Sequence, residues 1–475
     1  MRARSRGLHV LSALCFTLLC GASTPAWPAG GAGEAELALR LDETIRLALR
    51  HNRTVVGARM RRTTQKFELE VAEDRYRPRA SIEASAFAER DRKSGVEASF
   101  GPSMRIPTGG RFLLRWSEPM AGRDKDAGSW ELALAQPLLK GFGPEIDTAP
   151  LRVARIDEEI QLLALRDTIA GVVTSVIRAY RAVIRAGREI EISRESLARA
   201  RTQLETNRSL IRAGRMAARE IVQTEAELAN RELALMESRN SLESANAALI
   251  DILDIDGIPR IRASANLAVK PVRPDRGQSV ETAMARRPDH LQALLRVETA
   301  RIALRRAKND LLWDLSLNAG VKRGARGRTD HSVGVTLHIP LGDRSPKLRL
   351  LRAANDLRHA RMALAESRQA IHIAVRQAVH DVVAGFRRTE LSRQARELAE
   401  QKLDLEQRKL EQGLTSTFRL TTVEDDLVRA QNRELNAILG YLDALTALDR
   451  AQGTTLDRWG IEIERTGDGP GRLGP

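Results

Sequence analysis

The sequence predicts a mainly α-helical protein with a smaller β portion and an internal duplication. Two long stretches without proline, between Pro150 and Pro259 and between Pro346 and Pro470, are rich in Ala, Leu, Arg, Glu and Gln. These residues favour helices, and a helix over 347–411 would be about 100 Å long at about 1.5 Å per residue. Ahead of each long stretch the apolar residues change from a helical period to alternation, which predicts strands.

The same unit occurs twice along the chain. Gly413 follows Gly214 by 199 positions, and the residues around the two glycines align without a gap. The preceding helices align at a spacing of 235, as from Ala48 to Ala283, so about 36 residues are extra in the first unit. We expect a first repeat over 37–260 with a β-hairpin region at about 79–137, a second repeat over 278–455 with a β-hairpin at about 315–340, and a flexible C-terminal tail over 456–475.

Within each repeat the expected order is helix, hairpin, long helix, turn and long helix. The first of these helices would begin at Leu41 and continue to about Arg75, because Pro78 cannot extend it. Its twin would begin near Ser279.

The first 26 residues have the pattern of a secretory signal peptide, with a basic head, an apolar run over Leu8–Leu19 and small residues up to Ala26. Both cysteines, Cys15 and Cys20, lie inside it, so the mature chain would contain none. A lipid-modified Cys20 is the alternative, although Leu19 stands where such a site has a small residue. No later apolar run reaches 18 residues, so a membrane would be crossed by strands.

Two hairpins would supply four strands, each with one apolar and one polar face. Residues 95–110 would hold most of the extra length, as a longer hairpin. Four strands cannot close a membrane barrel, because the smallest have eight, so several chains would share one barrel. The alternative is a soluble protein whose hairpins pack on its helices. The apolar residues expected to mark the barrel strands are Ile82, Ala84, Leu132, Leu134, Leu317, Val333, Val335 and Leu337.

The aromatic side chains near the strands suit a membrane interface. They are Tyr76, Trp116, Trp130 and Trp313. Packing in a protein core is an equally simple interpretation for Trp313.

No motif of an enzyme, a cofactor site or a metal site is found in the sequence. His372 and His380, next to Asp381, lie eight positions apart, and an exposed helix face is the simpler interpretation. The net charge of +15 comes mostly from scattered arginines, and aromatic residues make up 3% of the chain. This distribution, together with the export signal, opposes a nucleic-acid-binding coiled coil. The acidic run Glu424-Asp425-Asp426 is typical of a solvated patch, with a contact to a partner protein as the alternative.

Four short motifs together resemble the outer-membrane efflux proteins, the TolC-like channels, over about 37–460. They are Leu-Asp-Glu-Thr-Ile-Arg-Leu-Ala-Leu at 41–49, Gln-Pro-Leu-Leu-Lys-Gly-Phe-Gly at 136–143, Arg-Pro-Asp at 287–289 and Glu-Gln-Gly-Leu-Thr-Ser at 411–416. The resemblance implies a homotrimer in the outer membrane of a Gram-negative bacterium. Four strands per chain would form a twelve-stranded barrel in the lipid, and the helices would form a tunnel through the periplasm.

The resemblance also implies that the helical turns form the periplasmic tip, which meets an adaptor protein of an inner-membrane pump. Candidate tip or gate residues are Gly214, Glu220, Gly413, Arg419 and Thr422. Family members often carry two acidic residues where Arg419 and Thr422 stand, so this chain departs from an acidic gate. A ring of Arg419 would favour anions unless Arg419 pairs with a neighbour on the helix surface.

The expected function is therefore a passive exit duct of a tripartite efflux or type I secretion system, without enzymatic activity. The alternative is a periplasmic or surface coiled-coil scaffold without a channel. The adaptor protein itself would be expected to show one helical hairpin inside β domains, which this sequence does not.

Overall fold

The computed structural model describes residues 36–89, 92–121, 128–255, 260–264, 267–324, 327–412 and 414–463. The predicted signal peptide with its two cysteines, and Gly413, lie outside the described residues. The elements of the first repeat are β1 (Glu36–Leu39), α1 (Leu41–His51), α2 (Arg53–Glu73), the 3₁₀ turn η1 (Asp74–Tyr76), β2 (Arg79–Glu89), β3 (Arg92–Arg105), β4 (Arg111–Ala121), β5 (Ser129–Pro137), α3 (Pro144–Asp147), α4 (Ala149–Arg212) and α5 (Glu220–Leu253). The remaining elements are β6 (Arg260–Ala263), α6 (Arg276–Arg286), α7 (Pro288–Asn309), β7 (Asp314–Arg323), β8 (Thr329–His338), α8 (Ser345–Glu411), α9 (Thr417–Gln452) and α10 (Thr455–Arg458).

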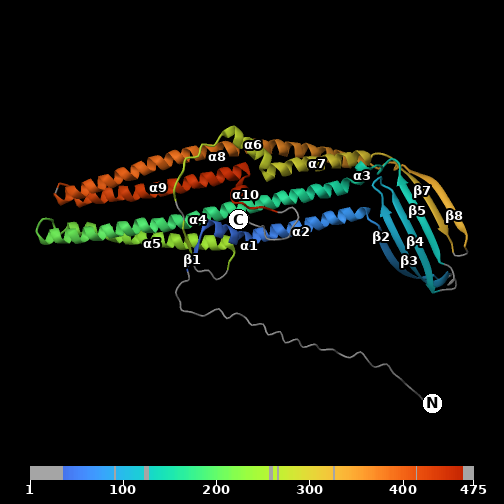
Figure 1. The fold of residues 1–475 in the computed structure, drawn as a ribbon, viewed down its shortest axis with the longest axis horizontal. Coiled ribbons are helices and arrows are strands. Elements are labelled where there is room, and N and C mark those ends of the chain that lie inside the picture. Colours follow the sequence, from blue (N-terminus) through green and yellow to red (C-terminus); the bar gives the residue numbers. More distant parts are fainter. Residues whose placement is uncertain are drawn as a thin grey trace, which may run out of the picture. The chain divides into compact units, whose positions relative to one another are not determined.

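This order confirms the predicted fold class of long antiparallel helices with a β portion and an internal duplication (Figure 1). Helix α4 has 64 residues and α8 has 67, which correspond to about 96 and 100 Å. Each packs along its partner, α5 or α9. Gly214 closes the first turn at φ +68°, a left-handed conformation that glycine adopts without strain. At the second turn Ser416 caps α9 by accepting a hydrogen bond from the Arg419 amide at 3.3 Å.

The first helix does not run unbroken from 41 to 75, as the sequence predicted. It breaks at Asn52, whose side chain accepts hydrogen bonds from the amides of Thr54 and Val55 at 3.0 and 3.3 Å and so begins α2. The second repeat breaks at the matching place, where Arg287 is extended and Pro288 opens α7. In the second repeat the proline predicts this break from the sequence, whereas in the first repeat a single asparagine cap causes it.

The sheet has six strands instead of the four that were predicted. Its order is β2-β3-β4-β5-β7-β8, and every neighbouring pair is antiparallel. The second repeat supplies one hairpin, β7 and β8, whereas the first supplies four strands. The extra residues of the first repeat form β3 and β4, which lie between the strands that correspond to β7 and β8. The glycines and the proline within β3 disfavour strands, which is why the sequence did not reveal it.

The largest apolar core lies where the long helix α4 meets α1, α2 and α5. Val173, Val176, Ile177 and Tyr180 of α4 are almost fully buried in it. One window of α4 reaches a mean hydropathy of 1.5, so this helix is long and apolar enough to cross a membrane by length and composition alone. Half of that window is buried inside the structure, and α4 contributes residues from Leu165 to Ile184 to this core.

Two buried tyrosines fix the segment that connects the repeats. The Tyr180 hydroxyl lies 2.9 Å from the Ser264 carbonyl and accepts from the Ser264 amide at 3.0 Å. The Tyr441 hydroxyl donates to the Lys270 carbonyl at 2.8 Å and accepts from the Val272 amide at 3.1 Å. The connector is therefore hydrogen-bonded to a helix of each repeat.

The segment directly after α9 is ordered. Residues 455–458 form α10, and Ile461 is 9% exposed and packs in the same core as α4. The predicted flexible tail is thus wrong for 456–463, because apolar side chains there pack against the helices. The rest of the predicted tail lies outside the described residues.

Candidate channel: a two-faced sheet and two helical turns

One face of the six-stranded sheet is apolar from its first strand to its last. The register pairs Ile82 with Phe100, Phe100 with Trp116 and Trp116 with Trp130, so these residues share a face. All eight residues that the sequence analysis placed on the apolar side of the strands lie on this face. Ile82 is 82% exposed and Val333 is 79% exposed. Other apolar members of this face are Ala98, Phe112, Leu114, Leu315, Ala319 and Val321.

Charged residues on the apolar face lie toward the end of the sheet away from the helices. Glu118 lies near the end of β4, and Arg323 ends β7 opposite Trp130. Trp313 directly precedes β7 at the other end and is 55% exposed, which excludes core packing for it within this chain. The apolar stretch between the two tryptophans spans about ten residues of β7, or about 25 Å of height for strands tilted by about 40°. That height matches the apolar band of membrane barrels.

The opposite face of the sheet is polar. Asn318 of β7 donates to the Thr336 hydroxyl of β8 at 3.1 Å, and Glu131 of β5 stands in register with both Arg115 and Lys322. The remaining positions are mostly small or polar, such as Ser81, Ser85, Ser99, Ser103, Ser117, Ala133, Ala135, Ser316, Gly320, Ser332 and Gly334. A sheet with one apolar and one polar face can separate lipid from water.

Hydrogen bonds join the sheet to the helices at the β3–β4 turn. The buried carboxylate of Asp147, at the end of α3, accepts from Arg105 of β3 at 2.8 and 2.5 Å. Gln136, the first residue of the motif at 136–143, donates to the Thr108 carbonyl at 3.2 Å and accepts from its hydroxyl at 3.0 Å. The Gly143 amide donates to the same carbonyl at 3.0 Å. The motif thus connects the β3–β4 turn to the start of α4.

Glycine is required where this turn approaches the motif. Gly109 has φ +97°, and a Cβ there would lie 2.3 Å from the Gly141 carbonyl oxygen. Tyr76, expected as an interface aromatic, donates from its hydroxyl to the Asp147 carbonyl at 2.7 Å at this junction.

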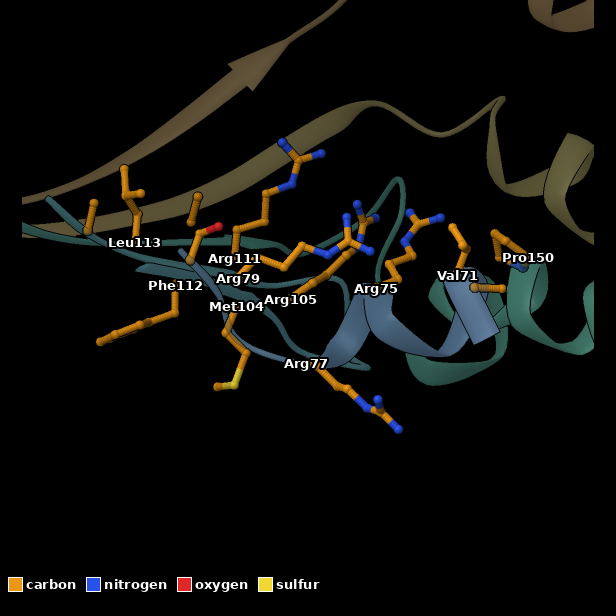
Figure 2. A pocket seen from close by; sticks show the side chains of 14 residues that line it. Val71, Arg75, Arg77, Arg79, Met104, Arg105, Arg111, Phe112, Leu113 and Pro150 are labelled. Atoms are coloured by element: carbon orange, nitrogen blue, oxygen red, sulfur yellow. The ribbon is translucent and has the colours of Figure 1, made fainter. Parts of the chain in front are cut away.

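A cavity of about 770 Å³ at the junction is lined by five arginines (Figure 2). Arg105 is neutralised by Asp147, and Arg77, which points away from the others in Figure 2, pairs with Asp74 at 2.9 Å. Arg75 and Arg111 form no ion pair within the described part of the chain. The helix end of the polar face therefore carries an excess of positive charge. The sequence analysis missed this cluster because its arginines come from three separate segments.

The candidate tip residues lie at the ends of the helical hairpins farthest from the sheet (Figure 1). Glu220 begins α5 and is half-exposed. Arg419 lies in the first turn of α9, is exposed, and makes no ion pair among the residues described. Thr422 is half-exposed, and its hydroxyl donates to the Phe418 carbonyl at 2.9 Å. Leu414 and Phe418, on either side of the α9 cap, are 71% and 65% exposed.

A hydrogen bond closes the second turn. Glu406 of α8 accepts from the Thr415 hydroxyl at 2.5 Å. This hydrogen bond, followed by the charges of Lys409 and Arg419, lowers the pKa of the Glu406 carboxyl. The carboxylate therefore stays ionised and holds the turn against α8.

The acidic run of α9 is partly buried, and one of its residues links the two helical hairpins. Glu424 is 6% exposed, and burial raises the pKa of its carboxyl against the opposing charges of Arg199 and Arg231. Asp425 pairs with Arg231 of α5. Asp426 pairs with Lys402 of α8 at 2.8 Å. The expectation of a solvated patch was wrong for Glu424, because α9 packs against Arg199 and Arg231 of two other helices, whereas Asp425 and Asp426 are half-exposed.

The histidine pair lies on the outside of α8. His372 and His380 are exposed, and His380 Nδ1 is 3.4 Å from Asp381 Oδ1. No cluster of three or more metal-ligating side chains occurs among the described residues.

Comparison with known proteins agrees with this geometry. The profile of the outer membrane efflux protein family matches residues 44–253 and 280–454, which cover most of both repeats. No curated protein sequence matches the chain.

Several solved structures share the fold. The Campylobacter jejuni CmeC outer membrane channel superposes with a TM-score of 0.66 and 13% identity, over 87% of this chain and 86% of that chain. The outer membrane protein VceC of Vibrio cholerae superposes with a TM-score of 0.66 and 17% identity, over 87% of this chain and 96% of that chain. The open state of the Neisseria gonorrhoeae MtrE outer membrane channel superposes with a TM-score of 0.67 and 16% identity, over 88% of this chain and 89% of that chain. At these identities the likeness concerns the fold, and the family rests on the profile match. The chain belongs to the outer membrane efflux protein family, and it is a transport channel of the Gram-negative outer membrane that extends into the periplasm, with no enzymatic role.

Proposed function

We propose that three copies of the chain form a passive exit duct of a tripartite efflux or type I secretion system. The observation that carries this proposal is the sheet with one apolar and one polar face, attached to helical hairpins of about 100 Å. The apolar face would contact outer-membrane lipid, and the polar face would line the water-filled lumen. The long helices would continue the lumen through the periplasm.

Open sheet edges support an assembly of several copies. Among the residues that the structure describes, strands β2 and β8 each pair on one side only. An unpaired edge inside lipid leaves backbone amides and carbonyls without partners, which costs several kcal/mol per group. A closed ring of chains removes this cost.

The tip would meet a periplasmic adaptor protein, which connects the duct to an inner-membrane pump. The exposed apolar residues Leu414, Phe418 and Val222, which flank the two helical turns, support a protein contact there. The pump would supply energy and select the cargo, so the duct itself transports passively.

The first experiment measures the mass of the detergent-extracted protein from separated membranes by light scattering, followed by conductance in planar bilayers. A trimer from the outer-membrane fraction that forms channels supports the proposal. A species that is soluble without detergent would refute it and favour a coiled-coil scaffold.

The charge at the tip provides a second test. Arg419 is exposed and unpaired within the described residues, so a ring of three arginines would favour anions. Arg419→Asp is expected to shift the reversal potential in a salt gradient toward cation preference. Arg408→Asp, at an exposed position of α8 that pairs with Asp404, is the control and should leave the reversal potential unchanged. An unchanged potential in the Arg419 variant would show that this residue does not line the constriction.

A further inference from the structure

We propose that each chain contributes all six strands to the shared barrel, so that a trimer closes a barrel of 18 strands. This inference rests on the trimeric channel proposed above and changes the width of its membrane part. The sequence resemblance implied four strands per chain and a barrel of twelve.

The strand pairing places the hairpin of β3 and β4 inside the sheet. Strands β2 and β5 are not neighbours, since β3 pairs with β2 on one side and with β4 on the other, and β4 pairs with β5. The hairpin of β3 and β4 therefore lies within the sheet and not at its edge. Moving it out of the barrel would break the hydrogen bonds along two pairs of strands at once.

The apolar and polar faces of the sheet continue across the hairpin of β3 and β4. Ala98 and Phe100 of β3, and Leu114 of β4, continue the apolar face. Ser99 and Ser117 stand in register with each other and continue the polar face. A hairpin that lay in water on both sides would not require this sorting.

Side-chain and backbone contacts anchor the turn between β3 and β4. Arg105 is fixed by the buried Asp147, and Thr108 is bonded to Gln136 and Gly143. The turn between β3 and β4 is therefore held at the same level as the start of α4. Strand β3 has 14 residues and β4 has 11, which is enough to cross a bilayer when tilted.

The directions of the two edge strands also fit closure between copies. With six alternating strands per chain, β8 of one copy runs opposite to β2 of the next. The open edges of neighbouring copies can therefore pair antiparallel, as all other strands of the sheet do. The occupant of each edge is thus a second copy of this chain.

The expected consequence is a wider barrel. With strands about 4.8 Å apart and tilted by about 40°, 18 strands give a backbone diameter of about 36 Å, against about 24 Å for twelve. The cross-section at the backbone would be larger by a factor of about two. Barrels of 16–18 strands generally enclose an open aqueous channel.

Electron cryomicroscopy of the wild-type trimer in lipid nanodiscs tests the inference directly. Eighteen strands in the membrane section are expected, and twelve strands would overturn it. Spin labels on single cysteines provide a second test, since the mature chain is expected to contain no other cysteine. In reconstituted vesicles, oxygen relaxes labels that face lipid, and a water-soluble nickel chelate relaxes labels that face the lumen.

Labels at Ala98→Cys and Leu114→Cys are expected to respond to oxygen, and labels at Ser99→Cys and Ser117→Cys to nickel. Val333→Cys and Ser332→Cys on β8 are the matched control pair. If only the control pair alternates between oxygen and nickel, β3 and β4 lie outside the barrel and this inference fails while the channel stands. If the control pair does not alternate either, the membrane barrel itself is refuted.

Discussion

Placing a charge on the apolar face of β8 tests whether that face contacts lipid. Val333 is the fifth of ten residues in β8 and is 79% exposed in the single chain. At about 2.5 Å of height per tilted residue, it lies close to the middle of an apolar band of about 25 Å. An arginine at that depth in a membrane barrel costs about 2–4 kcal/mol.

The expected effect of Val333→Arg follows from this cost. A loss of about 2–4 kcal/mol per chain lowers the folding equilibrium constant about 30- to 900-fold. Three copies in one barrel experience the loss together, so the assembled trimer should unfold at a clearly lower urea concentration. The assay is urea unfolding in phospholipid vesicles, followed by the fraction of trimer that resists SDS.

Ser332→Arg is the matched control, because Ser332 is adjacent in the sequence and lies on the polar face opposite Gly320. It should change the stability by less than about 0.5 kcal/mol, as substitutions at water-exposed positions usually do. Equal losses for the two variants, or no loss for either, would refute the assignment of one face to lipid and the other to water.

Three further predictions concern the helices and their junction with the sheet. Arg105→Met leaves the buried Asp147 carboxylate unpaired and should lower the free energy of unfolding in urea by about 3–5 kcal/mol. Adding Asp147→Leu should recover most of this loss. A single variant as stable as the wild type would contradict the role of this pair. Arg231→Ala removes the ion pair with Asp425 that joins the two helical hairpins and should raise single-channel conductance. Arg429→Ala, which breaks an exposed pair within α9, is the control and should not. Equal conductance in the two variants would count against a role of the Arg231–Asp425 pair. Glu424 has a raised pKa in the folded chain, so its ionisation destabilises the fold at neutral pH, and this cost disappears as the pH falls below the ordinary value of 4.5. Glu424→Gln should therefore raise the melting temperature at pH 8 but not at pH 4, and an equal gain at both would argue against burial as the cause.

The sequence revealed the parts of the fold that depend on local patterns. The helical stretches, the turn at Gly214 and the β7–β8 hairpin follow from composition, glycine placement and clean alternation such as Val333 and Val335. The number of strands was missed because β3 contains Gly101 and Pro102, and because Leu113 interrupts the polar face of β4. The spacing difference between the repeats located the extra residues but not their pairing.

The candidate sites depended more on contacts between distant segments. Glu424 was expected in water, but its burial requires Arg199 and Arg231 from the other repeat, which no local pattern encodes. The arginine-lined cavity has the same origin, since Arg75 and Arg111 are brought together by the junction of α2 with the sheet. The candidate tip residues could be proposed from the sequence because a turn is local, whereas these clusters could not because they are tertiary.

The contacts between the two repeats also explain why two additional strands fit into the sheet, whereas an additional helix would not fit among the helices. Ion pairs between the repeats, such as Arg181 with Asp443 and Arg450 with Asp167 at 2.7 and 2.6 Å, fix the helices of one repeat against those of the other. An extra helix would disturb these contacts along its whole length. An extra hairpin adds two strands, so β5 still returns to the level from which β2 departed, and α4 still begins on the same side of the membrane. A single extra strand would instead leave α4 on the opposite side and would make the edges of neighbouring copies run parallel. Only insertions of an even number of strands preserve both the helices and the antiparallel closure, and the addition of β3 and β4 meets that condition.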